Sequence, residues 1–182
     1  ELPQLLAKRN SIVVYSTTEP LEALLFGGNT ATLHEGKVVQ FGPTNEVYQY
    51  PNNLISAQVF SEPIMNQVKV IKKGNELFMQ SGVKWQLKGK TANLQDGEYA
   101  FGIRPHHFKI RAKNDGFIRI SGTVDISEIS GSDSVIHFKN DDGFWIVHLS
   151  GIHSHSFGNS IELYMDTTKG ILFDDNGNAI LN

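Results

Sequence analysis

The spacing of apolar residues changes near residue 58. Before this point, short apolar runs alternate between helical spacing and strand spacing. After it, the helical spacing nearly disappears, and short apolar runs are separated by Gly, Asn and Asp. The first pattern is typical of an α/β sheet, and the second is typical of antiparallel strands joined by tight turns. The sequence therefore predicts two regions, residues 1–57 and residues 58–182.

The strongest strand signal of the first region is the run Ile-Val-Val-Tyr at residues 12–15. A β-branched run bounded by polar residues is typical of a strand buried on both faces, which needs neighbouring strands on each side. Only a helix turn, with Leu2, Leu5 and Leu6 at helical spacing, precedes it. We therefore expect residues 1–57 to be the end of a larger α/β domain.

Turn residues divide the rest of the first region. Pro20 fits the first turn of a helix that Gly27 and Gly28 end. Residues 30–33 and 37–41 read as a hairpin, with Gly36 at a position of positive φ. Thr44 is expected to cap a short helix over residues 45–49, which the sequence Pro-Asn-Asn at residues 51–53 ends.

The second region reads as a small antiparallel barrel or sandwich. Its strand candidates are short and lie between turns such as Asp96-Gly97 and the Asp-rich segment at residues 140–143. The predicted strands are residues 68–71, 76–79, 98–103, 117–129, 134–139, 144–149, 160–165 and 171–173. The fold class expected for the whole chain is mainly β.

Composition excludes several kinds of partner and site. The net charge is −3 and the basic residues are scattered, which argues against nucleic-acid binding because phosphates are bound by basic stripes. The chain has no cysteine, so disulfides and thiolate metal sites are excluded. Its apolar runs are far shorter than the roughly 20 residues that span a bilayer. We therefore expect a cytoplasmic protein without direct membrane insertion.

Several short motifs occur in the order seen in one family. Together they resemble the ATP-binding subunits of maltose-type ABC importers, which take up sugars and polyols, over about nine-tenths of the chain. The motifs are the corner Thr17-Thr18-Glu19 with Glu22-Ala23, the hairpin exit Gln-Phe-Gly-Pro at residues 40–43, the segment at 46–52, Pro63-Ile-Met-Asn66, the segment Gly-Ile-Arg-Pro-His-His at 102–107, the turn at 131–134 and the final strand near Phe173.

This resemblance implies a C-terminal fragment of such a subunit. Residues 1–57 would be the C-terminal remnant of the nucleotide-binding domain, and residues 58–182 an OB-like β-barrel regulatory domain of the TOBE/MOP type. The parent protein would bind ATP and Mg²⁺ and couple their use to solute uptake, with this part supplying dimerisation and regulation. Expected partners are a second copy of the chain, forming a homodimer, and the permease subunits, which would hold the protein at the inner membrane.

The sequence contains no Gly-x-x-x-x-Gly-Lys-[Ser/Thr] phosphate loop and no ABC signature. The chain is therefore expected to have no cofactor of its own and to be inactive in ATP hydrolysis by itself. An alternative interpretation is a free-standing OB-like module that binds a small ligand or an oxyanion.

Thr18 is the one catalytic candidate that the resemblance supplies. It stands where the family has a histidine that reaches the γ-phosphate and the attacking water. A hydroxyl can donate one hydrogen bond but cannot become a cation, so part of that role would be lost. An equally weighted interpretation is that Thr18 only caps the helix that begins at Pro20.

Other side chains carry weaker hypotheses. A metal site could use His148, His153 and His155, although solvated loop histidines are more common. Arg104, at the end of an apolar strand, is expected to tie loops together by bidentate hydrogen bonds rather than to bind a ligand. Five aromatic residues could stack on a base or a sugar, but core positions are the more common use of such residues. They are Trp85, Phe101, Phe144, Trp145 and Phe157.

Overall fold

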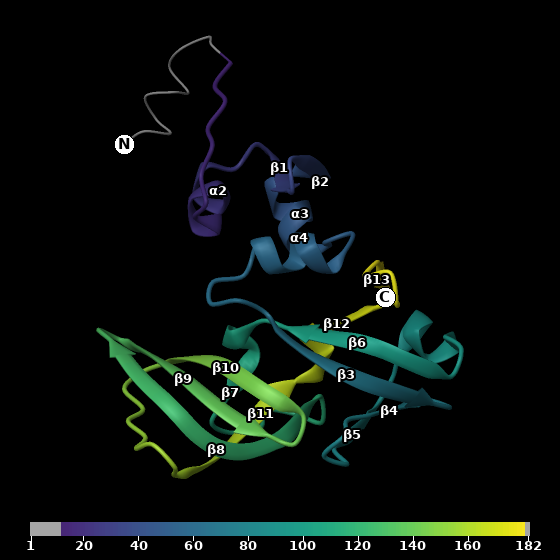
Figure 1. Cartoon of the computed structure of the whole chain (residues 1–182), viewed down its shortest axis with the longest axis vertical. Coiled ribbons are helices and arrows are strands. Elements are labelled where there is room, and N and C mark those ends of the chain that lie inside the picture. The colour runs from purple at the N-terminus through teal and green to yellow at the C-terminus, as the bar shows by residue number, and fades with distance from the viewer. Residues whose placement is uncertain (1–11, 181–182) are drawn as a thin grey trace.

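The computed structural model describes residues 12–180 (Figure 1). We call residues 12–59 the N-terminal region and residues 66–180 the β region. In Figure 1 the helices and the first hairpin lie above two curved sheets. The expected helix turn with Leu2, Leu5 and Leu6 lies outside the described residues.

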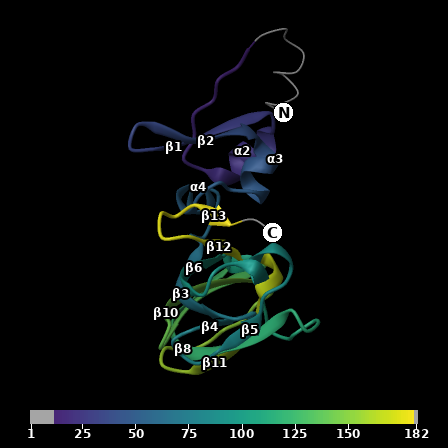
Figure 2. The same cartoon turned by 90° about the vertical axis from the view of Figure 1, so that its right-hand side faces the viewer.

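Three short helices and one hairpin make up the N-terminal region. The predicted helix is α2 (Pro20–Phe26), and Gly27 follows it with a φ of 67°. The predicted hairpin is β1 (Asn29–His34) paired with β2 (Lys37–Pro43), and Gly36 at its turn has a φ of 74°, a conformation that glycine adopts without strain. Two helices follow, α3 (Thr44–Gln49) and α4 (Leu54–Val59). Figure 2 shows the hairpin extending to one side of α2 and α3.

The strand predicted at residues 12–15 is wrong for this structure. These residues are extended but belong to no sheet, and Ile12 and Val14 are 98% and 92% exposed. A strand exists only where a neighbouring strand completes its hydrogen bonds, and no other strand of the described residues pairs with this segment.

Thr44 does not cap α3 as predicted. It is the first residue of the helix, and Pro43 occupies the capping position without a side-chain hydrogen bond. The Thr44 hydroxyl instead donates to the carbonyl oxygens of Gly27 and Gly28, at 3.1 and 3.2 Å. Thr44 therefore joins the start of α3 to the end of α2.

The β region contains eleven strands in two antiparallel sheets. One sheet has the order β13-β12-β6-β3-β4-β5, and the other has the order β10-β9-β8-β11-β7. The strands are β3 (Asn66–Lys73), β4 (Glu76–Phe78), β5 (Lys84–Gln86), β6 (Gly97–Ile103), β7 (Phe108–Lys109), β8 (Phe117–Ser130), β9 (Asp133–Asn140), β10 (Gly143–Ser150), β11 (Ser160–Asp166), β12 (Ile171–Phe173) and β13 (Ala179–Ile180). Three 3₁₀ turns, η1 (Gly89–Asn93), η2 (Pro105–His107) and η3 (Thr167–Lys169), join some of them.

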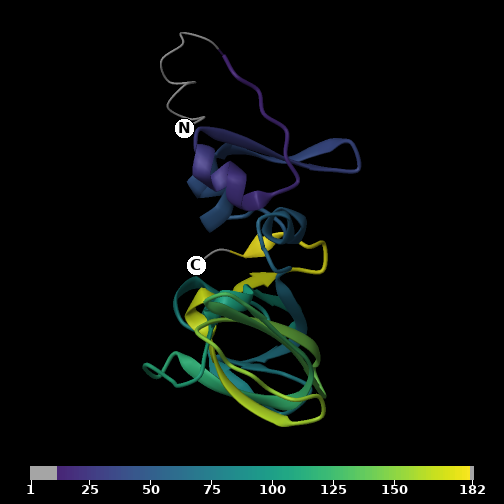
Figure 3. The same ribbon diagram turned by 90° about the vertical axis from the view of Figure 1, so that its left-hand side faces the viewer.

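The two sheets enclose an apolar core. Figure 3 shows the two sheets curving toward each other. Alternation along each strand selects the inward side chains, because successive residues point to opposite faces. In β3, for example, Val68 and Val70 are buried whereas Gln67 and Lys69 are exposed. The expected mainly β fold is confirmed, and each strand predicted after residue 58 is present.

Candidate functional site

The corner before α2 is held by the carboxylate of Glu22. Its Oε2 accepts hydrogen bonds from the Tyr15 hydroxyl, at 3.0 Å, and from the Thr17 hydroxyl. Thr17 Oγ1 in turn accepts from the backbone N–H of Glu19 at 2.9 Å. The Tyr15 ring also packs edge-on against Phe26, with the centroids 5.0 Å apart. Residues 15–22 therefore form a defined corner.

Thr18 lies at the exposed tip of this corner. The interpretation that Thr18 caps α2 is wrong, because Glu19 occupies the capping position and no side chain caps it. The neighbouring Thr17 makes the local hydrogen bonds instead, as threonine hydroxyls do in tight turns. No described residue bonds to the Thr18 hydroxyl, so it is free to meet another molecule or segment.

Gln40 joins the hairpin to the segment between α3 and α4. Its side-chain nitrogen donates to the carbonyl oxygen of Tyr50 at 3.1 Å, and its Oε1 accepts from the N–H of Asn52 at 2.9 Å. The side chain is 9% exposed. Buried amides are held where both ends find partners, and Gln40 satisfies both ends. This geometry explains the glutamine of the Gln-Phe-Gly-Pro segment.

Arg104 joins α3 to the end of β6. The guanidinium Nη2 donates to the carbonyl oxygen of Tyr48 at 2.6 Å, and its carbon lies 4.1 Å from the centroid of the Tyr48 ring. Phe60 packs edge-on against Tyr48, with the centroids 6.2 Å apart. The predicted structural role of Arg104 is confirmed, although the contact is one hydrogen bond with ring stacking rather than a bidentate pair.

Burial lowers the pKa of Arg104 and of the two histidines that follow it. The Arg104 side chain is 7% exposed, and this burial lowers its pKa, whereas Tyr48 acts in the opposite direction. Burial also lowers the pKa of His107 to about 3, assisted by the adjacent His106 and Arg104. The pKa of His106 is also lowered, by burial first and then by the charges of Arg104, His148 and Lys109. Both imidazoles are therefore mainly neutral at pH 7, while Arg104 carries its charge in a buried place.

A second connection between the N-terminal region and the β region is a backbone strap, in which residues 52 and 54 are hydrogen-bonded to residues 179 and 177. The N–H of Leu54 donates to the carbonyl oxygen of Gly177 at 2.9 Å, and the N–H of Ala179 donates to the carbonyl oxygen of Asn52 at 2.8 Å. Below the strap, Ala57 of α4 packs with residues of β6, β12 and β13 in a small apolar cluster. That cluster contains Ala57, Met65 and Phe173, with Leu54, Ala100, Ile171 and Ala179 at its edge.

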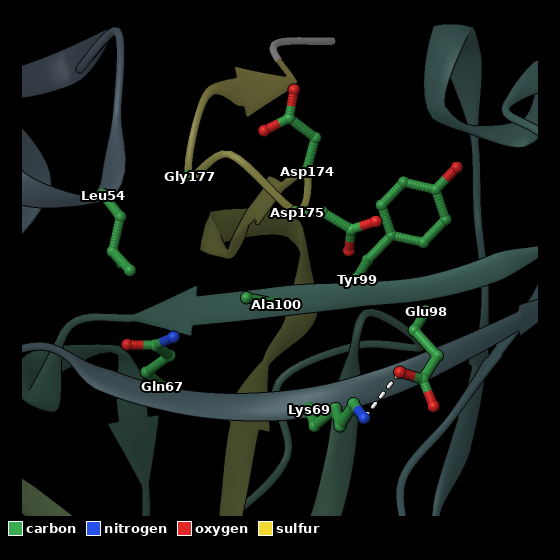
Figure 4. A pocket seen from close by; sticks show the side chains of 9 residues that line it. All are labelled: Leu54, Gln67, Lys69, Glu98, Tyr99, Ala100, Asp174, Asp175 and Gly177. Carbon is green, nitrogen blue, oxygen red and sulfur yellow. Dashed lines mark ion pairs between the residues drawn. The ribbon is translucent and has the colours of Figure 1, made fainter.

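A cleft of about 350 Å³ opens beside the strap (Figure 4). It lies between the turn after β12 and the outer surface of β3 and β6, and Leu54 forms one end. Lys69 and Glu98 form an ion pair on its floor. Asp174 and Asp175 add two more carboxylates, so the lining has an excess of negative charge and disfavours anions.

His148, His153 and His155, the residues of the weaker metal-site hypothesis, are not assembled into a metal site among the described residues. His148 lies 3.6 Å from Asp133, and His153 contacts the carbonyl oxygen of Ser150 at 3.0 Å. Within residues 12–180, no three histidine or carboxylate side chains come together as metal ligands. The Asp174 carboxylate accepts the N–H groups of Asn176 and Asn178, so this acidic segment forms a tight turn rather than a metal site.

The aromatic residues do not form one stacking platform. Trp85 packs edge-on against Phe101 in the core, and Trp145 is buried there as well. Phe144 and Phe157 are 74% and 79% exposed. The more common alternative, core packing, is therefore correct for three of the five residues.

The chain is similar in sequence to several known proteins. No protein-family model matches the chain. The chain is similar to the uncharacterized ABC transporter ATP-binding protein YurJ of Bacillus subtilis, with 26% identity over 96% of this chain and 50% of the relative. It is similar to the sn-glycerol-3-phosphate import ATP-binding protein UgpC of Escherichia coli, with 25% identity over 96% of this chain and 49% of the relative.

Among solved structures, the molybdate-binding protein ModG aligns with a TM-score of 0.44 and 15% identity, over 59% of this chain and 94% of that protein. The chain spans about half the length of the curated relatives that it matches. None of the helices that the structure describes has the length and apolar character needed to cross a membrane. Over 96% of its length, the chain is similar in sequence to ATP-binding proteins of ABC transporters and importers.

Proposed function

We propose that this chain is the C-terminal part of the ATPase subunit of an ABC importer for sugars or polyols. The observation that carries the proposal is similarity over 96% of the chain to the ABC transporter ATP-binding protein YurJ and to the sn-glycerol-3-phosphate import ATP-binding protein UgpC. Residues 1–57 then belong to the nucleotide-binding domain, and residues 58–182 form the regulatory domain. The parent protein uses ATP and Mg²⁺ in its other half.

Thr18 is the residue of this chain that we place at the nucleotide. It lies on an exposed corner whose backbone is fixed by Thr17 and Glu22, which is the arrangement needed to present a hydroxyl to a bound phosphate. The free Thr18 hydroxyl supports this role. The family pattern has a histidine at this position. In this chain we therefore expect the threonine hydroxyl, instead of an imidazole, to donate the hydrogen bond to the γ-phosphate or the attacking water.

We further propose a cytoplasmic protein that pairs with a second copy of itself and docks on membrane permease subunits. Exposed apolar side chains support such contacts, because large exposed apolar residues mark interaction surfaces when they gather. Leu21 and Leu25, four residues apart on α2 and so on one helix face, are 65% and 75% exposed.

The test is purification of the intact gene product from its own cells through a C-terminal tag. The proposal predicts that integral membrane subunits co-purify and that the complex hydrolyses ATP with Mg²⁺. A matched sample with the phosphate-loop lysine of the N-terminal half replaced by alanine should keep the membrane subunits and lose hydrolysis. Recovery of the tagged protein without membrane subunits and without ATP hydrolysis contradicts the proposal.

A further inference from the structure

One helix is bonded to both regions of the chain. Arg104, at the end of β6, holds the carbonyl oxygen of Tyr48 in α3. At the other end of α3, the Thr44 hydroxyl holds the carbonyl oxygens of Gly27 and Gly28, directly after α2. The helix is only six residues long, so these two contacts are less than two turns apart. A displacement at one end therefore reaches the other without bending a long element.

The hairpin is bonded to the same short segment. Gln40 of β2 holds Tyr50 and Asn52, which follow α3 directly. Thr32 of β1 adds a hydrogen bond of 3.1 Å to Ser56 of α4. Gln40 and Thr32 are both buried, so water cannot take the place of these partners if the hydrogen bonds break. The hairpin and α3 are thus expected to move together.

Arg104 differs from the other contacts between the two regions. The strap at residues 52–54 uses backbone groups of the terminal turn after β12, at the edge of its sheet. Arg104 follows β6, which is paired on both sides with β3 and β12. Its hydrogen bond is made by a charged donor, and such bonds are worth more than neutral ones. Arg104 therefore ties α3 to the central strands of the sheet rather than to a sheet edge.

We propose that Arg104 is a positioning residue that fixes the N-terminal region to the β region through α3, so that a change in the β region is transmitted to the hairpin and to the corner at Thr17, Thr18 and Glu19. The biological meaning of this coupling, regulation of the ATPase corner by the β region, rests on the proposed function. The coupling itself is a property of this chain and is tested without ATP.

The experiment is amide hydrogen exchange on the full chain, read separately for α3, for the β1–β2 hairpin and for the core strands β3 and β6. Replacing Arg104 by alanine should speed exchange in α3 and in the hairpin by the same factor, about tenfold or more, as expected for loss of a hydrogen bond to a charged group. Exchange in β3 and β6 should change much less. A residue that merely stabilised the β region would speed exchange in all segments together.

Three further variants make the test specific. Tyr48→Phe keeps both the ring and the carbonyl acceptor, so its exchange should match that of the unchanged chain. Arg104→Lys keeps the cation but loses the planar stacking, so its effect should be smaller than that of Arg104→Ala, and it serves if the alanine variant fails to fold. Arg119→Ala removes an exposed arginine paired with Glu162 and should leave α3 and the hairpin unchanged.

Two results would overturn the proposal. The first is faster exchange in α3 while the hairpin keeps its rate, which would show that α3 does not carry the coupling. The second is an equal effect in β3, β6 and the N-terminal region, which would show a general loss of stability. Either result leaves the proposed transport function untouched, because the purification of membrane subunits with the intact protein tests that separately.

Discussion

Asn66 and Ile146 exchange two hydrogen bonds across 80 residues of sequence. Asn66 Nδ2 donates to the carbonyl oxygen of Ile146, and the N–H of Ile146 donates to Asn66 Oδ1, both at 2.7 Å. Asn66 is the first residue of β3 and Ile146 lies in β10, so this side chain joins the two sheets in place of a strand pairing. The asparagine of the segment Pro63-Ile-Met-Asn66 therefore has a structural role, which is to connect the two sheets.

Replacing Asn66 by leucine should lower the free energy of unfolding by about 1–3 kcal/mol, because the N–H and C=O of Ile146 lose their partners in a partly buried place. Urea unfolding followed by tryptophan fluorescence measures this directly, since Trp145 is adjacent to Ile146. The neighbouring exposed Gln67, replaced by alanine, is the control and should change the free energy by less than about 0.5 kcal/mol. Equal effects of the two variants would refute the assigned role.

Gly102 is required by close packing rather than by backbone conformation. A Cβ atom at this position would lie 2.7 Å from Met65 Cε and 2.9 Å from Phe173 Cε2. Gly102→Ala should therefore lower the free energy of unfolding by about 1–3 kcal/mol, the usual effect of overpacking. Gly97, in the same strand, has open space at its Cβ position and is the matched control. A thermal unfolding midpoint unaffected by Gly102→Ala would contradict this packing argument.

His107 should make stability depend on pH. Its pKa falls from 6.5 to about 3 on folding, because burial, His106, Arg104 and, more weakly, Lys169 disfavour the charged imidazole. Asp166 acts in the opposite direction and raises the pKa. Between these pH values the unfolded chain binds more protons than the folded chain. The free energy of unfolding therefore decreases as the pH falls from 6.5 towards 3.

His107→Gln should reduce this pH dependence by on the order of one proton. The measurement is urea unfolding at pH 7 and at pH 5, with the exposed His34→Gln as a control. The loss of stability between the two pH values should be smaller for His107→Gln than for the control. Identical losses would show that His107 takes up its proton equally in both states.

Thr18 is tested in the full-length protein. If its hydroxyl contacts the γ-phosphate or the attacking water, Thr18→Val should lower kcat for ATP hydrolysis on the order of tenfold or more, because a donor to the transition state is lost. Thr18→His should raise kcat, since an imidazole can also carry charge. Steady-state ATPase rates with Mg²⁺ decide this. Unchanged kcat values for both variants would remove Thr18 from the catalytic machinery.

Local patterns predicted the elements well and their contacts poorly. Strand β3 was evident from the alternation of Val68 and Val70 with polar residues, and α2 from Pro20 and Gly27 at its two ends. Helix α4 was missed, because Asn53, which looked like part of a break, is its cap and accepts the N–H of Ser56. Strand β5 was missed because three residues around Trp85 show no period.

The partners of buried polar residues depend on the assembled fold. Nothing near Arg104 in the sequence indicates a carbonyl oxygen 56 residues earlier, and Gln40 gives no local sign that it bonds both Tyr50 and Asn52. Polar residues at strand ends were the available signal. Arg104 was predicted to be structural on that signal, but its acceptor could not be named.

The most direct test of the account is the mass of the intact protein in its own cells, with peptide sequencing of everything upstream of Glu1. The account predicts a protein about twice as long as this chain, as in its relatives, with a Gly-x-x-x-x-Gly-Lys-[Ser/Thr] segment in the upstream half. An intact protein that begins at or near Glu1, or an upstream half without that segment, would contradict it.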